Sequence, residues 1–295
     1  MAHPSPRSLL AKYGLRAKKS WGQNFLADDV ILEAIARLAV PRPGERVVEL
    51  GAGLGHLTAH LLALGAEVVA VERDRDMARV LRGEFGASLR LEEADAARLD
   101  LARLAATGPG GQARVAVVGN LPYHLTSPIL FSLLDQAEAV SRAVLLVQRE
   151  VAERLGASPG TKDWGLLSVL VQQRAEVRVE RIVPPGAFHP PPRVESAVVR
   201  IELGARAPAC ADPARFRRLV KGGFGQRRKT LRNALESARL APREDLALAL
   251  SRAGIVPSRR GETLTVEEWE ALDRALPGSH GEGEGPSPAS GSKTQ

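Results

Sequence analysis

The 295-residue sequence has little sulfur and no long apolar run. It has a single cysteine, Cys210, which excludes an intramolecular disulfide and a zinc site built on cysteines. Among the six histidines, His56 and His60 come nearest to a ligand spacing, but no cysteine or third histidine stands near them, so we predict no metal site. No uncharged apolar run approaches the ~20 residues that a membrane span needs, and the first residues contain no hydrophobic signal core. The sequence therefore predicts a cytoplasmic protein without a membrane partner.

Charge is distributed unevenly along this chain. Its composition, 44% apolar and 25% charged residues, is typical of a globular protein with a substantial core. Residues 205–260 hold fourteen Lys or Arg against four Asp or Glu, a net charge of +10. The remaining chain holds 27 basic and 30 acidic residues, and within it residues 1–24 hold five basic residues and no acid. Two basic segments therefore flank an acidic middle, which favours a polyanionic partner.

Residues 45–201 alternate short β-branched runs with longer helical stretches. Several of the runs are apolar on both faces, as in the strands of a parallel sheet covered by helices. Strand, helix and strand within about 25 residues form a βαβ unit, and its repetition predicts a doubly wound sheet. The predicted strands include Val47–Leu50, Glu67–Val71, Ala113–Val118, Ala143–Val147 and Ala197–Ile201.

After Leu203 the β pattern stops, and helical segments rich in Ala, Leu and Arg follow. Asp212 and Pro213 predict the start of one helix, because Asp accepts a hydrogen bond at the N-cap and Pro suits the first helical position. A later helix is expected to bury Leu231, Ala234, Leu235 and Ala238 on one face. The predicted parts are a basic N-terminal arm over 1–24, an α/β domain over 25–205, a small all-helical domain over 206–276 and a disordered tail over 277–295.

A glycine-rich turn follows the first predicted strand, at the place where a doubly wound sheet receives a nucleotide-like ligand. It reads Glu-Leu-Gly-Ala-Gly-Leu-Gly over residues 49–55, and His56 stands where a dinucleotide fingerprint requires its third glycine. Gly-x-Gly-x-Gly after an acid instead resembles motif I of the S-adenosylmethionine-dependent methyltransferases. Two acids follow the next strands: Glu72 is expected to accept hydrogen bonds from the ribose hydroxyls, and Asp95 from the adenine amine.

The sequence Gly-Asn-Leu-Pro-Tyr over residues 119–123 follows the fourth strand. It resembles the Asn/Asp-Pro-Pro-Tyr signatures of methyltransferases that modify exocyclic amino nitrogens. An adenine N6 amine is a poor nucleophile because its lone pair is delocalised into the ring, so the site must present acceptors for both N–H groups. The side-chain oxygen of Asn120 and the backbone carbonyl of Leu121 are expected to accept, while Pro122 fixes the turn and Tyr123 offers a stacking face.

A second aromatic residue, Phe188, precedes three consecutive prolines that stiffen its loop in an extended form. A flipped adenine held between Tyr123 and Phe188 would gain roughly 1 to 3 kcal/mol from each stacking contact. The sequence equally fits a core residue packed under the loop, so both interpretations of Phe188 stay open.

Six signatures in the same order resemble those of the ribosomal RNA adenine dimethyltransferases of the bacterial KsgA type, from Lys18 to about Leu272. They occupy residues 21–26, 49–55, 119–123, 148–151, 188–199 and 224–233. The resemblance implies a Rossmann-like methyltransferase domain with a mostly parallel sheet of seven strands, and a small C-terminal all-helical domain. It further implies S-adenosyl-L-methionine as cofactor, bound by Asn24, Leu26, Gly51, Gly53, Glu72, Asp95 and Asn120.

The resemblance implies N6,N6-dimethylation of two adjacent adenosines in the 3′-terminal hairpin loop of small-subunit (16S) ribosomal RNA. The expected partner is the immature small subunit, met by a monomeric enzyme with a role in subunit maturation. RNA contacts are expected from Arg227, Arg228, Lys229 and Arg232 in the basic helical domain. Trp164 stands where the family usually has Tyr, and His124 where Asn or Ser is common, which leaves target preference open.

Two other functions stay open. One is the related dimethyltransferase that modifies large-subunit RNA and confers macrolide resistance, which tends to have Ile in place of Leu121 and lacks the three prolines. The other is a ribosome-assembly factor whose helical domain gates small-subunit maturation, with methylation secondary. The basic segment 205–260 supports RNA binding in every case.

Overall fold

The computed structural model describes residues 3–106, 114–204, 206, 210, 212–226 and 228–277. The described residues form two compact units, the first from residues up to 156 together with 174–207, and the second from 157–173 together with residues from 208 onward. The second unit differs from the expected range 206–276 because it also contains 157–173. The expected tail lies outside the described residues except for Pro277.

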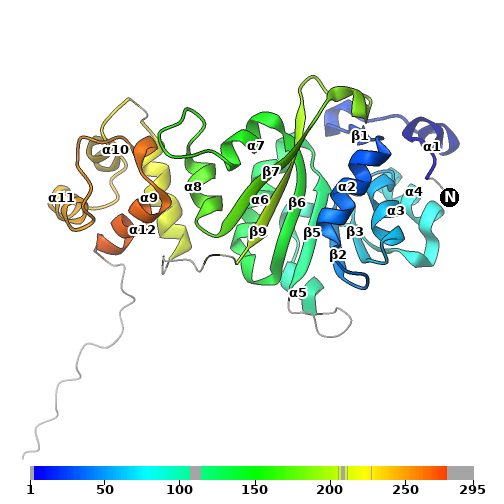
Figure 1. The fold of residues 1–295 in the computed structure, drawn as a ribbon, viewed down its shortest axis with the longest axis horizontal. Coiled ribbons are helices and arrows are strands. Elements are labelled where there is room, and N and C mark those ends of the chain that lie inside the picture. The colour runs from blue at the N-terminus through cyan, green and yellow to red at the C-terminus, as the bar shows by residue number, and fades with distance from the viewer. Residues whose placement is uncertain are drawn as a thin grey trace, which may run out of the picture. The chain divides into compact units, whose positions relative to one another are not determined.

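A seven-stranded sheet in the order β4-β3-β2-β5-β6-β9-β7 forms the centre of the first unit (Figure 1). Strands β2 to β6 pair in parallel, whereas β9 runs antiparallel to both of its neighbours, β6 and β7. The predicted mostly parallel, doubly wound sheet of seven strands is thus confirmed. The strands are β2 (Arg46–Leu50), β3 (Glu67–Val71), β4 (Arg90–Glu92), β5 (Val115–Asn120), β6 (Val140–Gln148), β7 (Ala175–Val183) and β9 (Ser196–Leu203).

In the first unit, a helix follows each of the strands β2 to β5 and connects it to the next parallel strand. Helix α2 begins at the N-cap Asp28, whose side chain accepts from the Ile31 amide, and it packs on α3 in one core cluster that includes Ile35, Leu61 and Val118. The helices are α1 (Pro6–Lys12), α2 (Asp29–Ala39), α3 (His56–Ala63), α4 (Arg75–Phe85), α5 (Leu101–Ala106), α6 (Thr126–Asp135) and α7 (Arg149–Leu155).

The N-terminal segment packs on this unit through a helix and a short strand. Leu9 and Leu10 of α1 are buried in a cluster with Phe25. Strand β1 (Phe25–Leu26) pairs antiparallel with β8 (Phe188–His189), which places Leu26 opposite Phe188. The start of the chain is therefore joined to the proline-rich loop.

The second unit is helical. The side chain of Asp212 accepts from the amides of Ala214 and Arg215 at 2.9 and 3.0 Å, which confirms the predicted cap. Leu231, Ala234 and Leu235 are buried as predicted, but Ala238 is exposed because it follows the end of its helix. The helices are α8 (Leu166–Gln172), α9 (Pro213–Phe224), α10 (Leu231–Ser237), α11 (Arg243–Arg252) and α12 (Val266–Ala275).

Buried contacts explain why residues 157–173 belong to this helical unit. Trp164 is 1% exposed and its indole N–H donates to the carbonyl of Leu264 at 3.0 Å. The amide of Gly160 donates to the carbonyl of Glu262 at 2.7 Å.

Within the part of the chain that the structure describes, no helix has the length and apolar character that crossing a membrane requires.

Candidate active site

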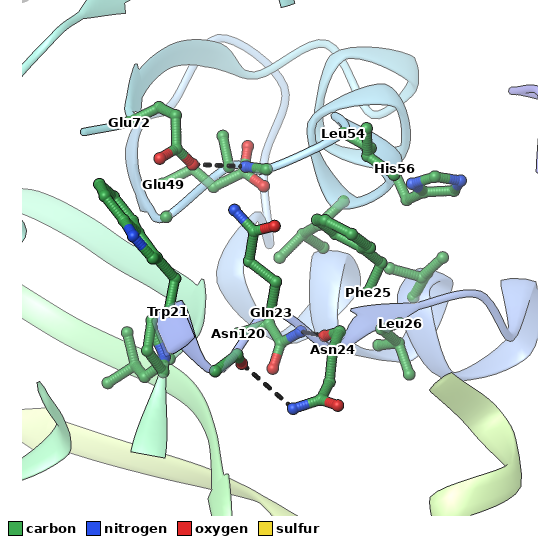
Figure 2. A pocket seen from close by; sticks show the side chains of 18 of the residues that line it. Trp21, Gln23, Asn24, Phe25, Leu26, Glu49, Leu54, His56, Glu72 and Asn120 are labelled. Atoms are coloured by element: carbon green, nitrogen blue, oxygen red, sulfur yellow. Dashed lines mark hydrogen bonds between the residues drawn. The ribbon is translucent and has the colours of Figure 1, made fainter. Parts of the chain in front are cut away.

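Two neighbouring cavities lie where β2, β3 and β5 end, at the carboxyl edge of the parallel strands. Figure 2 shows the first of them from close by. Among the residues predicted for cofactor and target, the first cavity is lined by Asn24, Leu26, Gly51, Gly53, Glu72, Asn120, Leu121, Pro122 and Tyr123. The second is lined by Gly51, Glu72, Asp95, Leu121 and Pro122. The structure therefore brings nearly all of these residues together, and Gly51, Glu72, Leu121 and Pro122 line both cavities.

The glycine-rich turn curls around the end of β2 in a conformation that only glycine adopts readily. Gly51 has a φ of 70° and Gly53 a φ of 56°. A Cβ on Gly53 would lie 3.2 Å from the ring of Phe25, whose strand covers the turn. The turn is thus shaped by backbone freedom and by the close approach of the N-terminal segment.

Glu72 holds this turn from the end of β3. Its Oε2 accepts from the Gly53 amide and its Oε1 from the Asp74 amide, each at 2.8 Å. Burial raises the pKa of the Glu72 carboxyl, while the amide hydrogen bonds lower it. An ionised carboxylate offers about four lone-pair positions, so two remain after these bonds to accept from hydroxyl groups in the cavity.

Asp95 stands at the wall of the second cavity, just after β4. One carboxylate oxygen accepts from the Ala97 amide at 3.0 Å, which fixes the side chain as the cap of a short 3₁₀ turn. The other oxygen lies 3.4 Å from a guanidinium nitrogen of Arg73. The carboxylate is held in place on one side and reachable from the cavity on the other.

Residues 21–26 form a roof over the first cavity. Asn120, at the end of β5, donates from its amide nitrogen to the Asn24 carbonyl at 2.8 Å, and Asn24 in turn donates to the Gly22 carbonyl at 3.1 Å. Figure 2 shows Asn120 and Asn24 next to one another. Because the nitrogen of Asn120 is engaged by the roof, its oxygen is the atom that remains to accept; no described residue donates to it.

A buried carboxylate fastens the roof to the helix that follows Glu72. Asp74 is 2% exposed, and its oxygens accept from Lys18 Nζ at 2.7 Å and from Gln23 Nε2 at 2.8 Å. It also caps α4 through the Asp76 amide. The sequence did not reveal this latch, because Asp74 has the pattern of an ordinary N-cap and its partners lie about fifty residues earlier in the chain.

The two predicted stacking residues have different surroundings. Tyr123 lines the first cavity, and its hydroxyl lies 2.8 Å from Ser196 Oγ, which holds the ring. Phe188 is 5% exposed and lies in the core cluster beside its strand partner Leu26, itself a lining residue. Phe188 therefore adjoins the cavity wall as a packed residue, and its stacking role stays a prediction.

Glu49 is a further buried acid in the first cavity that the predictions gave no role. It is 2% exposed, and Thr58 Oγ1 donates to its Oε2 at 2.6 Å. Burial, with a smaller contribution from the neighbouring Glu72, raises the pKa of Glu49 to about 8. In the sequence, Glu49 is the acid that begins the glycine-rich motif, and this position was the one feature that pointed to it.

The residues predicted to contact RNA are only partly available. Arg228 and Lys229 are exposed, and no described carboxylate forms an ion pair with either. Arg232 instead pairs with Glu236 at 2.9 Å along α10. Arg227 lies outside the described residues.

The family model described as "Ribosomal RNA adenine dimethylase" matches residues 14–274, a range that includes both units. The chain belongs to the ribosomal RNA adenine dimethylase family. It is therefore an RNA-methylating enzyme, as the six signatures predicted.

Relatives of this dimethylase carry a more specific name. The "Ribosomal RNA small subunit methyltransferase A" of Anaeromyxobacter dehalogenans (strain 2CP-C) is 69% identical over 279 residues, which cover 93% of this chain and 98% of the relative. The protein of the same name from Myxococcus xanthus (strain DK1622) is 52% identical over 275 residues, covering 92% and 95%.

Solved structures share the fold of the dimethylase. The crystal structure of "23S rRNA methyltransferase ErmE" matches with a TM-score of 0.65 at 27% identity, over 86% of this chain and 99% of that one. A dimethyladenosine transferase from Plasmodium falciparum matches with a TM-score of 0.69 at 23% identity, over 84% and 95%. The Rossmann-like methyltransferase fold is thus established.

The two departures from the family pattern lie in different units. His124 lines the second cavity, and its ring lies 3.7 Å from where a Cβ on Gly22 would stand. Trp164 is buried in the helical unit. His124 therefore lies where a ligand in the second cavity would meet it.

Proposed function

We propose that this dimethylase transfers methyl groups from S-adenosyl-L-methionine to N6 of two adjacent adenosines in the 3′-terminal hairpin loop of small-subunit ribosomal RNA. The observation that carries the proposal is the meeting of two motifs at one cavity. The glycine-rich turn with Glu72 forms one wall, and the Asn-Leu-Pro-Tyr segment beginning at Asn120 forms the other. The name of the 69% identical relative supports the choice of the small subunit.

The donor set of the cavities fits the proposed cofactor. Glu72 stands where the cavities meet, with two lone-pair positions left to accept from ribose hydroxyls. Asp95 in the second cavity would accept from the adenine amine, and Gly51 and Gly53 let the backbone approach the ligand closely. Asn24, Leu26 and Asn120 would close the first cavity over the amino-acid portion. When bound, S-adenosylmethionine supplies an electrophilic methyl group on a sulfonium sulfur.

The residues of the target motif act on the nucleophile. We propose that Asn120 Oδ1 and the carbonyl of Leu121 accept from the two N–H groups of the adenine amine, which favours a pyramidal nitrogen with an available lone pair. Tyr123, held through Ser196, and Phe188 would fix the plane of the flipped base. The methylated nitrogen is an ammonium that loses its proton to water, so no side chain has to act as a strong base.

The RNA itself would be recruited electrostatically. The exposed Arg228 and Lys229, with Arg227 and a weaker contribution from the paired Arg232, are the proposed phosphate contacts of the helical unit. The proposed partner is the immature small subunit, approached by a monomer in the cytoplasm, where that subunit is assembled.

Methyl transfer from labelled S-adenosylmethionine tests the function directly. Immature small subunits, intact large subunits and naked ribosomal RNA are offered in parallel, and the products are digested and separated by mass spectrometry. We expect N6,N6-dimethyladenosine in small-subunit RNA alone. Label confined to large-subunit RNA would favour the activity named for the ErmE structure, and stoichiometric binding to small subunits without label would favour an assembly factor.

A further inference from the structure

The N-terminal segment carries cationic side chains that the proposed site does not use. Of the five basic residues before residue 24, Lys12 and Lys18 form ion pairs with acids at α4. Arg7, Arg16 and Lys19 are exposed, and no ion pair joins any of them to a described carboxylate. These three residues are called the unpaired triad below.

All three members of the unpaired triad line a single groove. Leu10 and Leu15 contribute apolar surface to it, and His189 and Pro190 come from the end of β8 and the residue after it. No Asp or Glu is among its lining residues. The groove is thus cationic, partly apolar and without an internal counter-charge.

The groove is connected to the roof of the first cavity by chain neighbours and by a strand pair. Lys19 begins the short turn that ends at Trp21, which lines both cavities. His189 pairs with Phe25 in the β1–β8 ribbon and directly follows Phe188. A nucleic-acid strand that delivers one base to the cavity would therefore present its neighbouring phosphates to this surface.

We infer that the groove binds the phosphodiester backbone of the RNA substrate beside the nucleotide that is methylated. The inference rests on the proposed function and adds to it a contact from the N-terminal segment of the first unit. Guanidinium groups donate two parallel hydrogen bonds to phosphate oxygens. A cationic groove with apolar surface for sugars and bases is the usual combination at sites for single-stranded nucleic acid, such as a hairpin loop.

A charge-matched pair of triple variants tests the groove. The groove variant is Arg7→Ala/Arg16→Ala/Lys19→Ala, and the control is Arg37→Ala/Arg82→Ala/Arg178→Ala, which removes three exposed, ion-paired arginines from the same unit. We expect the groove variant to bind small-subunit RNA at least tenfold more weakly, with a salt slope lower by about 2, at about 0.7 per single-strand phosphate contact. The control should change affinity less than twofold, and both should bind S-adenosylhomocysteine like the wild type in calorimetry.

Three results would overturn the inference. The first is an equal loss of RNA affinity in the two triple variants, and the second is an unchanged salt slope in the groove variant. The third is a groove variant that binds RNA like the wild type and binds phosphatidylserine vesicles more weakly, which would assign the groove to a membrane surface. A wild-type protein that leaves small subunits unmethylated would instead reject the proposed function, so the two failures are distinguishable.

Site-specific crosslinking provides a second measurement that does not depend on losing affinity. Ala11 lines the groove and is exposed, whereas Ala87 is exposed but is not among its lining residues. In a Cys210→Ser background, Ala11→Cys and Ala87→Cys would each carry a benzophenone. We expect Ala11→Cys to crosslink to nucleotides next to the methylated adenosines, and equal crosslinking from both positions would contradict the inference.

Discussion

Asn120 donates from its side-chain nitrogen to the Asn24 carbonyl in the roof, which leaves its side-chain oxygen for the proposed contact with the adenine amine. An acceptor that matters most when the amine is pyramidal affects the transition state more than the ground state. Asn120→Ala should therefore lower kcat by about a hundredfold, as is typical of groups that act on the reacting centre, with a smaller change in KM for RNA. Single-turnover methylation assays measure the split.

Asn120→Ala also removes the hydrogen bond to the Asn24 carbonyl in the roof, and a second substitution at the same position controls for this loss. Asn120→Asp keeps an acceptor and loses the donor to Asn24, so it should retain far more activity than Asn120→Ala. If both variants lost activity equally, or if the whole effect of Asn120→Ala fell on KM, the residue would be a roof anchor alone.

Glu49 should make stability depend on pH. Its pKa of about 8 in the folded chain exceeds the ordinary value of 4.5, so between these pH values the folded state binds the proton and the unfolded state loses it. The free energy of unfolding contributed by Glu49 therefore falls as pH rises through this window, by a few kcal/mol at most, since one pKa unit is about 1.4 kcal/mol.

Glu49→Gln removes this titration and keeps an oxygen to accept from Thr58. We expect its melting temperature to match that of the wild type near pH 5 and to exceed it near pH 8.5. The exposed Glu33→Gln serves as the control and should follow the wild type at both values. Parallel melting curves for Glu49→Gln and wild type across this range would show that Glu49 is ionised in the folded chain.

At the residue scale, the sequence allowed us to predict which residues line the cavities where those residues directly follow a strand. Gly51, Glu72 and Asn120 each follow a recognisable strand, and parallel strands end at one edge. The latch between Asp74 and Gln23 was not predictable, because it depends on how a distant segment returns to the sheet. Arg232 forms an ion pair with Glu236 one helical turn away, and its contact with RNA stays a prediction.

At the scale of elements, α9 and α12 of the helical unit pack without room for one further methyl group. A Cβ on Gly223 would lie 2.3 Å from the fully buried ring of Trp269. Alanine would gain about 1 kcal/mol of helix propensity there, but overpacking a core costs typically 1 to 3 kcal/mol. We expect Gly223→Ala to lower the free energy of unfolding, measured by chemical denaturation.

A matched control exists in the same unit. Gly165 precedes α8 at its N-cap, and a Cβ there meets nothing within 4 Å among the described residues. Gly165→Ser should therefore leave stability unchanged or raise it slightly, because Ser is favoured at an N-cap. Greater stability in Gly223→Ala than in wild type would show that the ring of Trp269 moves aside.

Elements were predictable to different degrees. Strands β2, β3, β5 and β6 were recognisable in the sequence as apolar runs, because a central parallel strand is buried on both faces. Strand β7 lies at the sheet edge with mostly exposed residues, so its sequence lacks that signal. The β1–β8 pair consists of two residues on each side, too few for any periodicity.

On the scale of the whole molecule, the chain leaves the first unit and returns to it before the helical unit is complete. The sequence predicted a boundary at the change from β-rich to helical composition. Residues 157–173 are instead placed by Trp164, whose hydrogen-bond partner Leu264 lies a hundred residues later. Composition cannot show such a contact, because the helices of both units are rich in Leu and Ala.

The place of β9 in the sheet has a consequence for the order in which the first unit assembles. β9 lies between β6 and β7 although it follows both in the chain. Until residues 196–203 are in place, one edge of β6 has no hydrogen-bonding neighbour and β7 has no strand to join. The first unit is therefore expected to complete its sheet in a late kinetic step. By then the ribosome has already released α8, which belongs to the helical unit and precedes β9 in the chain.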